Sequence, residues 1–379
     1  MTNTTIRFLP FSDHEAHQAT QDVFAYEGFL DGMYKYLPKE VCNYFVKTKD
    51  EIHSIYDFQS KMTHMFLLAI QKKSLTHRTS SGFDQLDKNQ KYLYISNHRD
   101  IVLDNAFMNA LLHENGVDTC EFAIGSNLMK HPISDNLFRL NKSFVVMREG
   151  TPRELYAHSV NLSKYIASQI SEKKSSIWIA QREGRAKDGN DRTQVSLLKM
   201  LTMSNRKDLV GFAKSLKIVP VSISYEFDPC DVLKAVEFIT KRNNPDYKKT
   251  FRQDVESMLK GLIGDKGHLH FHFDKPLDEE LDAINEIENK KEQFELLADI
   301  IDRSVHRNFK LHPINYVAYD LQNESTTFLN DKYNEADLEK YSRIFNEEKL
   351  SHLDLSEEDL KIAKSYLMGI YANPVVNAL

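Results

Sequence analysis

Hydrophobic and polar positions follow two different patterns along the 379-residue chain. From about residue 12 to residue 75, apolar side chains recur every three or four positions and helix-breaking residues are few, which predicts amphipathic helices. From about residue 91 the pattern changes to short β-branched and aromatic runs, each of which predicts a strand: KYLYIS, SFVVM, SSIWIA, KIVPVSISY and GHLHFHF. Between the two parts, the polar segment THRTSSGFDQLDKNQ contains a glycine and predicts a loop.

The segments between these strands are long enough for helices. This alternation predicts an α/β fold with a mixed, largely parallel sheet flanked by helices. From about residue 280 the sequence is again helical in pattern and strongly charged. We therefore expect a helical N-terminal region over residues 1–80, an α/β domain over residues 81–300, and a helical C-terminal extension over residues 301–379.

Composition narrows the class of protein. With 41% hydrophobic and 27% charged residues the chain is typical of soluble globular proteins, and its net charge of −6 predicts no nucleic-acid partner. Three cysteines without a CxxC pair predict a reducing compartment and no zinc knuckle. The segment MTNTTIRFLPF lacks the pattern of a signal peptide, and no apolar run approaches the ~18 residues of a membrane span. We expect a cytoplasmic protein that at most binds a membrane surface.

The segment YISNHRDIVLDNAF permits two interpretations. His98, Arg99, Asp100 and Asn105 match the protein-kinase catalytic loop H-R-D-x-x-x-x-N. A kinase also needs a glycine-rich strand pair and a VAIK-type lysine upstream, with DFG and APE segments downstream. The sequence has none of these, so the kinase interpretation is excluded. The second interpretation is an apolar strand that delivers His98 at its end, with Asp104 six positions later.

Several segments that follow one another resemble the ordered blocks of the glycerolipid acyltransferase superfamily, which includes glycerol-3-phosphate and lysophosphatidate acyltransferases. SNHRDIVLD resembles the first block, N-H-x-x-x-x-D, and KSFVVMR is similar to the second. REGRAKDG resembles the third block, of the E-G-x-R-S-x-x-G type, and IVPVSISYE the fourth. HLHFHFDKPLD is similar to the strand that closes such domains. The resemblance covers about residues 86–280, and it rests on the order and spacing of the blocks.

The sequence departs from the family pattern at two places. Five residues, rather than four, separate His98 from Asp104, and the third block is one residue short, so that Arg185 directly follows Gly184. Either a one-residue bulge returns Asp104 to His98, or Asp100 contacts the imidazole instead. We favour Asp104, because the family pattern places its aspartate in the turn that enters a helix.

The resemblance implies that an acyl group moves from acyl-carrier protein or acyl-CoA to a lipid hydroxyl, without a further cofactor. An alcohol attacks a thioester slowly unless its proton is removed, and a histidine can accept that proton. His98 is then the general base. Asp104 would fix its tautomer and stabilise the imidazolium. No protein nucleophile is needed, which fits the absence of a G-x-S-x-G segment.

The acceptor implied by the resemblance is lysophosphatidate or glycerol-3-phosphate, whose phosphate requires cations. Glu183 would bind a glycerol hydroxyl or orient an arginine, and Gly184 would let the backbone approach closely. Pro220 is expected to bend its strand and admit the acyl chain, or to lie in an edge strand. For Arg182 and Arg192 a solvated surface position is equally open. The acceptor-binding candidates are Arg99, Arg148, Glu183, Gly184, Arg185 and Lys187.

Three alternatives stay open. The acceptor could be another lipid hydroxyl, such as that of an amino-acid lipid. A non-catalytic protein that binds a lipid or a carrier would explain the two departures, and a thioesterase would use water in place of the alcohol.

Two further patterns carry weaker hypotheses. His268, His270 and His272 alternate on one face of a strand, as metal ligands can, but no acidic or cysteine partner lies near them in sequence, so no metal site is expected. Charged residues interleave with the apolar stripe of the N-terminal helices. We therefore expect those helices to support the core, rather than to rest on lipid.

Overall fold

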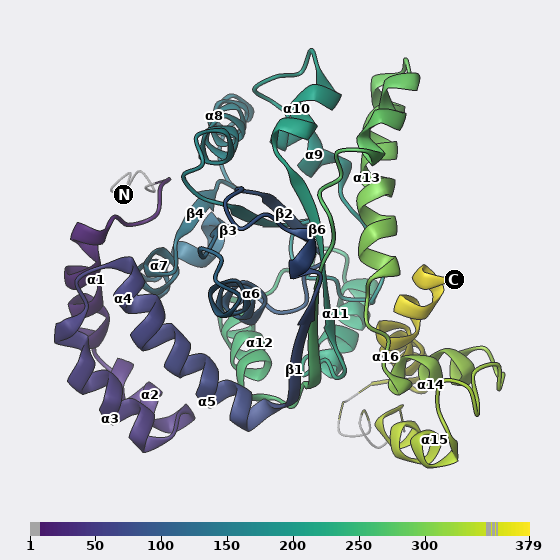
Figure 1. Ribbon diagram of the computed structural model, residues 1–379. Helices are drawn as coiled ribbons and strands as arrows, with labels where there is room; N and C mark the ends of the chain where they lie inside the picture. The colour runs from purple at the N-terminus through teal and green to yellow at the C-terminus, as the bar shows by residue number, and fades with distance from the viewer. Residues whose placement is uncertain (1–7, 346–349, 351–352, 354) are drawn as a thin grey trace.

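A seven-stranded sheet lies at the centre of the protein (Figure 1), whose computed structural model describes residues 8–345, 350, 353 and 355–379. The strand order is β1-β7-β6-β2-β5-β3-β4. Five strands, from β6 to β4 in this order, run in one direction, and β7 pairs with β6 in the antiparallel sense. The predicted mixed, largely parallel α/β sheet is thus confirmed. The strands are β1 (Leu75–Ser81), β2 (Leu93–Ser96), β3 (Glu121–Gly125), β4 (Ser143–Val146), β5 (Ile177–Ala180), β6 (Ile218–Tyr225) and β7 (Gly267–Phe273).

Two strands do not follow the sequence prediction. Leu75–Ser81 was expected to lie in the helical region and the polar loop after it, but it forms the edge strand β1, whose partner is β7. The predicted boundary at residue 80 therefore falls inside a strand. Strand β3 was not predicted, although it lies between β5 and β4. Residues 1–7, on which part of the signal-peptide expectation rests, lie outside the described residues.

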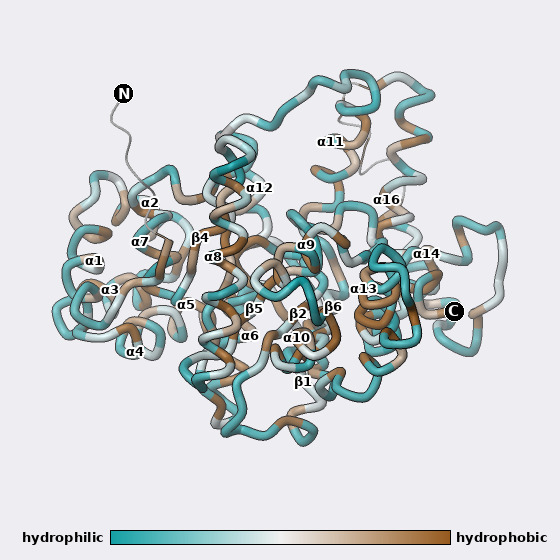
Figure 2. Tube along the Cα trace, turned by 90° about the horizontal axis from the view of Figure 1, so that it is seen from above, coloured by the Kyte–Doolittle hydropathy of each residue, from teal (hydrophilic) through white to brown (hydrophobic). Residues whose placement is uncertain are grey.

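Both faces of the sheet are covered by helices, because the central strands are apolar at successive positions. On β2, Tyr94 packs into one buried cluster, while Leu93 and Ile95 pack into another. The first cluster includes α5 (His64–Ser74), α6 (Leu103–Glu114) and α7 (Pro132–Leu140), with α12 (Phe251–Ile263) packed against it. The second includes α8 (Pro152–Ser171), α9 (Val195–Leu201), α10 (Leu209–Ser215) and α13 (Lys290–Arg307). Figure 2 shows apolar residues in the interior and hydrophilic ones at the periphery.

The N-terminal helices have a small apolar core of their own, which includes Ala16, Phe45 and Ile52 and reaches Leu140 of α7. The apolar side chains of this core thus pack on protein, whereas others of the region, such as Tyr56 and Leu68, are exposed. In this region lie α1 (Asp13–Ala25), α2 (Phe29–Tyr36), α3 (Lys39–Thr48) and α4 (Ile55–Asp57), followed by the π-helix η2 (Phe58–Thr63). No helix among the described residues is both long and apolar enough to cross a membrane.

The helical character predicted after residue 280 is also present. The predicted boundary at residue 300 falls inside α13, whose buried face packs on the sheet, so the α/β part and the extension share this helix. Farther along, α14 (Pro313–Gln322), α15 (Glu335–Ser342) and α16 (Glu357–Ala378) pack around a third apolar cluster with α11 (Asp231–Asn243).

The strand directions determine where the motif residues gather. Strands β2, β4 and β5 end at the same edge of the sheet, just before His98, Arg148 and Glu183 respectively. Pro220 is buried on β6, between β2 and the antiparallel β7. The expectation of an edge-strand proline is therefore wrong. The pairing with β7 ends at Val221, so the missing N–H of Pro220 breaks no bond to that strand.

Candidate functional site

His98 and Asp104 meet at the carboxyl end of β2. The His98 Nδ1 lies 2.8 Å from the Asp104 Oδ2, and the imidazole ring packs edge-on against Trp178 of β5 at 5.7 Å between centroids. The His98 side chain is 14% exposed, while that of Asp104 is fully buried. Among the described residues no hydrogen bond reaches His98 Nε2. The ring is therefore held by one nitrogen, which leaves the other for a substrate.

Asp104 lies in the first turn of α6, and its carboxylate is surrounded by donors. The Oδ2 accepts hydrogen bonds from the backbone N–H groups of Arg99 at 2.6 Å and Asp100 at 3.0 Å. The Oδ1 accepts one from the hydroxyl of Tyr225 at 3.1 Å. Burial and the nearby Asp104 raise the pKa of Tyr225 well above its usual value, which keeps the phenol as a donor. Together with the positive end of the α6 dipole, these donors compensate for the burial of the Asp104 side chain.

Asp100 has a different task in the same turn. Its Oδ1 accepts hydrogen bonds from the N–H groups of Val102 at 2.9 Å and Leu103 at 2.8 Å, so it caps the start of α6. Its other oxygen faces Gly261 of α12, where an added Cβ would lie 2.3 Å from it. Of the two aspartates that the spacing left open as partners of His98, Asp104 contacts the imidazole, and Asp100 bonds to the backbone of the turn.

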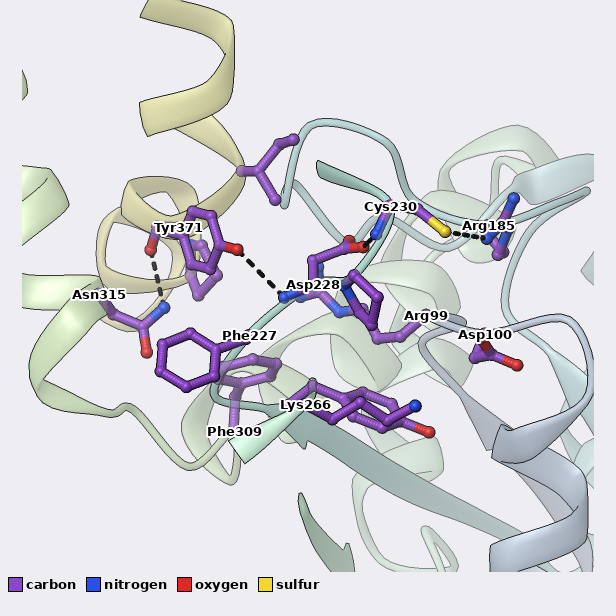
Figure 3. A pocket seen from close by; sticks show the side chains of 14 residues that line it. Arg99, Asp100, Arg185, Phe227, Asp228, Cys230, Lys266, Phe309, Asn315 and Tyr371 are labelled. Carbon is purple, nitrogen blue, oxygen red and sulfur yellow. Dashed lines mark hydrogen bonds between the residues drawn. The ribbon is translucent and has the colours of Figure 1, made fainter. Parts of the chain in front are cut away.

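An open pocket of about 480 Å³ lies beside this turn (Figure 3). Arg185 reaches into it, donating to the Ser257 hydroxyl at 2.7 Å and lying 3.7 Å from the Cys230 sulfur. Among the described residues no carboxylate lies within ion-pair distance of its guanidinium. The pocket is otherwise lined by Arg99, Asp100, Tyr225, Phe227, Asp228, Pro229, Lys266, Phe309, Asn315, Ile370, Tyr371 and Pro374.

Two cations of this pocket are already engaged. Arg99 lies 2.5 Å from the buried carboxylate of Asp191 and stacks over the ring of Phe309. Lys266 is fully buried and donates to Ser74 and to two backbone carbonyls, and burial lowers its pKa to about 8. Arg185 is therefore the pocket cation that is freest to bind an added anion.

The remaining predicted cations lie outside this pocket. Arg148, at the end of β4, pairs with the carboxylate of Glu183, as expected if Glu183 orients an arginine. Lys187 pairs with Glu237 of α11. Arg192 is exposed and contacts Asn190, and Arg182 is partly buried. The structure thus brings Arg99 and Arg185 into one pocket, and it divides Arg148 and Lys187 between two other places.

The third-block loop, residues 182–190, is tied to the catalytic turn. The Ala186 N–H donates to the His98 carbonyl at 3.0 Å. Gly184 has φ of +71° with open space around it, so glycine serves the backbone conformation here. Gly189 serves close approach, because a Cβ there would lie 2.2 Å from the Ile370 carbonyl of α16. Asn373 of α16 donates to the Asp188 carbonyl at 2.7 Å, so α16 supports the loop.

The three histidines of β7 form a polar ladder with β1. Thr79 lies between His268 and His270, at 2.7 and 2.8 Å, and Ser81 lies between His270 and His272, at 3.1 and 2.8 Å. Burial lowers the pKa of His270 to about 4. Hydroxyl partners and neutral imidazoles make this ladder a structural contact between two strands.

Sequence reasoning missed three residues that hold the turn. Tyr225 bonds to Asp104, Asp191 bonds to Arg99, and Asn97 bonds through both amide atoms to the backbone of Ile223. Tyr225 is the last residue but one of the fourth block and Asn97 precedes His98, so their places in the motifs were the available indications. Asp191 lies in DGNDRT, which has no pattern that points to Arg99. Pro220 does not line the pocket.

The comparison with protein-family models agrees with the motif analysis. Residues 77–225 match the family model described as Acyltransferase, a span that contains the first three blocks and the fourth as far as Tyr225. A solved structure, the 1-acyl-sn-glycerophosphate (LPA) acyltransferase PlsC from Thermotoga maritima, is 15% identical with a TM-score of 0.33. That match covers 76% of this chain and 92% of the other. The comparison with curated proteins gave no match.

Proposed function

We propose that the protein acylates a hydroxyl of a glycerolipid precursor, because residues 77–225 match the Acyltransferase family model and carry the motifs described above. The acyl donor is a thioester of CoA or of acyl-carrier protein. The acceptor is lysophosphatidate or glycerol-3-phosphate, which places the reaction in phospholipid biosynthesis. The protein would meet these lipids at the membrane surface.

One observation carries this proposal: the imidazole of His98 is held at Nδ1 by a fully buried carboxylate. This arrangement supports a general base. Nε2 takes the proton of the acceptor hydroxyl, and the charge of Asp104 stabilises the imidazolium that forms. The alcohol oxygen bonds to the thioester carbonyl carbon as its proton leaves. The tetrahedral intermediate then expels the thiolate, which takes the proton from Nε2, so that ester and thiol are the products.

The phosphate of the acceptor would bind in the pocket of Figure 3. Arg185 supports this role, since its guanidinium contacts only neutral partners and can form paired hydrogen bonds to a phosphate. Arg148 would act from the other side of the turn. It would first have to share or release Glu183.

The test is an assay of purified protein with an acyl thioester and a panel of acceptors: glycerol-3-phosphate, lysophosphatidate, an unphosphorylated glycerolipid and an amino-acid lipid. We expect ester formation with a phosphorylated acceptor. The His98→Ala variant should lose at least ~100-fold in rate while its thermal unfolding stays that of the wild type.

Other outcomes separate the alternatives. Free fatty acid released without an acceptor would indicate a thioesterase, and a preference for the amino-acid lipid would change the acceptor class. No turnover with any donor, in a folded protein that binds lysolipid, would indicate a non-catalytic binding protein and contradict the proposal.

A further inference from the structure

A second group of cations surrounds a single buried carboxylate outside the pocket. Glu237 on α11 is 4% exposed, and it contacts the ammonium groups of three lysines. Lys241 lies 2.8 Å and Lys249 3.1 Å from the carboxylate, and Lys187 is the third partner. One negative charge is thus shared by three positive charges. The excess of two positive charges is local, because the whole protein is acidic.

The ammonium groups of this lysine cluster, Lys187, Lys241 and Lys249, are accessible. Their side chains are 38%, 49% and 21% exposed respectively. Burial lowers the pKa of Lys187, and repulsion from the other two lysines acts in the same direction. An added anion would relieve that repulsion. The connection between α11 and α12, which carries Lys249, is hydrophilic along its length (Figure 2).

A stacked aromatic pair lies next to the cluster. Phe238 follows Glu237 on α11, and its ring stacks on Tyr366 of α16 with 4.2 Å between centroids and 14° between planes. Phe238 is 38% exposed although it is a large apolar side chain. A flat base can extend such a stack, and cations beside an aromatic ring are how proteins hold the phosphate and base of a nucleotide.

The lysine cluster is linked to the catalytic turn through one short segment. Lys187 directly follows Ala186, whose N–H bonds to the His98 carbonyl. The Ala186 carbonyl in turn accepts a hydrogen bond from Lys234 of α11 at 2.9 Å. A ligand held by the lysine cluster is therefore anchored on the same loop as the base. A substrate with a long flexible arm between its phosphates and its reacting carbon suits this arrangement.

We propose that Lys187, Lys241, Lys249 and Phe238 bind the nucleotide end of a CoA thioester, with the lysines on its phosphates and Phe238 against the adenine. The inference rests on the proposed acyl transfer, because it names the carrier of the acyl group. It adds a donor site to the acceptor pocket described above.

Binding is tested by calorimetric titration with adenosine 3′,5′-bisphosphate. The variant Lys241→Gln/Lys249→Gln retains Lys187 to neutralise Glu237. The matched control is Lys275→Gln/Lys291→Gln. Each of those lysines, like Lys241 and Lys249, pairs with a glutamate, but the glutamate lies four residues later in the chain and outside the cluster. We expect the wild type and the control to bind alike, and the double variant to bind at least about tenfold more weakly.

Kinetics give the second readout. In the Lys241→Gln/Lys249→Gln variant we expect the KM for acyl-CoA to rise about tenfold with little change in kcat, while the KM for an S-acyl-pantetheine, which has no nucleotide, stays unchanged. Phe238→Leu should raise the KM for acyl-CoA by a smaller factor. An equal rise for both donors, no rise for acyl-CoA, or a rise confined to the phosphorylated acceptor would each overturn the proposal.

The two proposals fail in different ways. If no thioester supports transfer, the proposed function fails, and the calorimetric comparison still tests the nucleotide site. If transfer occurs only from acyl-carrier protein and the bisphosphate does not bind, the nucleotide site is disproved while the acyltransferase activity stands.

Discussion

The turn between β2 and α6 and the third-block loop after β5 lie at the same edge of the sheet, yet their charges are held in opposite ways. In the turn, the Asp104 carboxylate is fully buried and receives two backbone N–H groups, the imidazole and a phenol. In the loop, Lys187 is partly exposed and has a single carboxylate partner. Arg148, which follows β4 and pairs with Glu183 of the loop, is also partly exposed.

The difference indicates a division of labour. A base must keep one position and one tautomer through each turnover, which a buried and fully bonded carboxylate provides. Cations that bind a substrate must exchange partners, so side chains that are partly exposed suit them. Changes in the turn should therefore affect the chemical step, and changes in the loop should affect binding.

Replacing the aspartates of the turn one at a time by asparagine should produce the largest effect and the largest contrast. Asp104→Asn should lower kcat/KM by ~100-fold, because an amide cannot stabilise the imidazolium. Asp100→Asn should cost less than about tenfold, because an amide oxygen can still accept from the Val102 and Leu103 N–H groups. Steady-state assays at matched folded fractions check this. If Asp100→Asn is the more damaging change, the hydrogen bond seen at Asp104 is not the catalytic one.

Replacing Arg185 of the loop, or Arg148, which pairs with the loop, should give the next largest effect. Arg185→Ala should raise the KM for a phosphorylated acceptor about tenfold or more, and Arg148→Ala should raise it less, because Glu183 already balances that charge. Arg192→Ala is the control, since its exposed side chain contacts Asn190. Losses in kcat alone would contradict the division between turn and loop.

Removing one donor from Asp104 should have a modest effect. Tyr225→Phe leaves three donors, so we expect about 1 kcal/mol less stability and a fall of a few-fold in kcat. Tyr165→Phe is a matched control, because that phenol also donates to a partly buried carboxylate, Glu121, away from the turn. Denaturant unfolding should show similar losses for both variants. If kcat falls equally in Tyr225→Phe and Tyr165→Phe, the hydrogen bond from Tyr225 has no specific role in catalysis.

The smallest effect on turnover concerns a histidine that has no carboxylate partner and lies outside the turn and the loop. In the polar ladder the pKa of His270 is lowered to about 4, so the unfolded chain, with a value near 6.5, takes up a proton first as pH falls. Above about pH 6.5 His270 is neutral in both states and does not oppose folding. As pH falls from 6.5 toward 4, protonation of the unfolded chain lowers the free energy of unfolding. Melting temperatures measured across that range should fall less steeply for His270→Gln than for the exposed His14→Gln. Equal slopes would contradict the lowered pKa.

The sequence predicted five of the seven strands and missed β1 and β3. Strands β2, β4, β5, β6 and β7 correspond to the five apolar runs. In β1, LTHRTSS has one apolar residue, because its side chains bond to the ladder histidines at the sheet edge, so no hydrophobic pattern indicates a strand. In β3, EFAIG is five residues long and carries a glutamate. Only Phe122 and Ile124 of this strand are aromatic or β-branched, so the run gave no distinct strand pattern.

The motifs located the site, but they could not give its pairings. The spacing did not decide between Asp100 and Asp104. The start of α6 at Leu103 separates them, because Asp104 lies within the helix and Asp100 lies in the turn before it. Contacts such as Tyr225 to Asp104 and Arg99 to Asp191 join residues about a hundred positions apart. They depend on strand order, which a single sequence does not specify.

The support that α16 gives to the third-block loop also bears on protein synthesis. A ribosome adds roughly 5–20 residues per second, so His98 and Asp104 leave it well before Ile370 and Asn373 are made. Until those residues reach the loop, Gly189 has no backbone to pack against and the Asp188 carbonyl lacks its amide donor. A nascent chain would then contain His98 before α16 is present to line the pocket beside the turn. We expect the growing polypeptide to stay inactive until α16 docks.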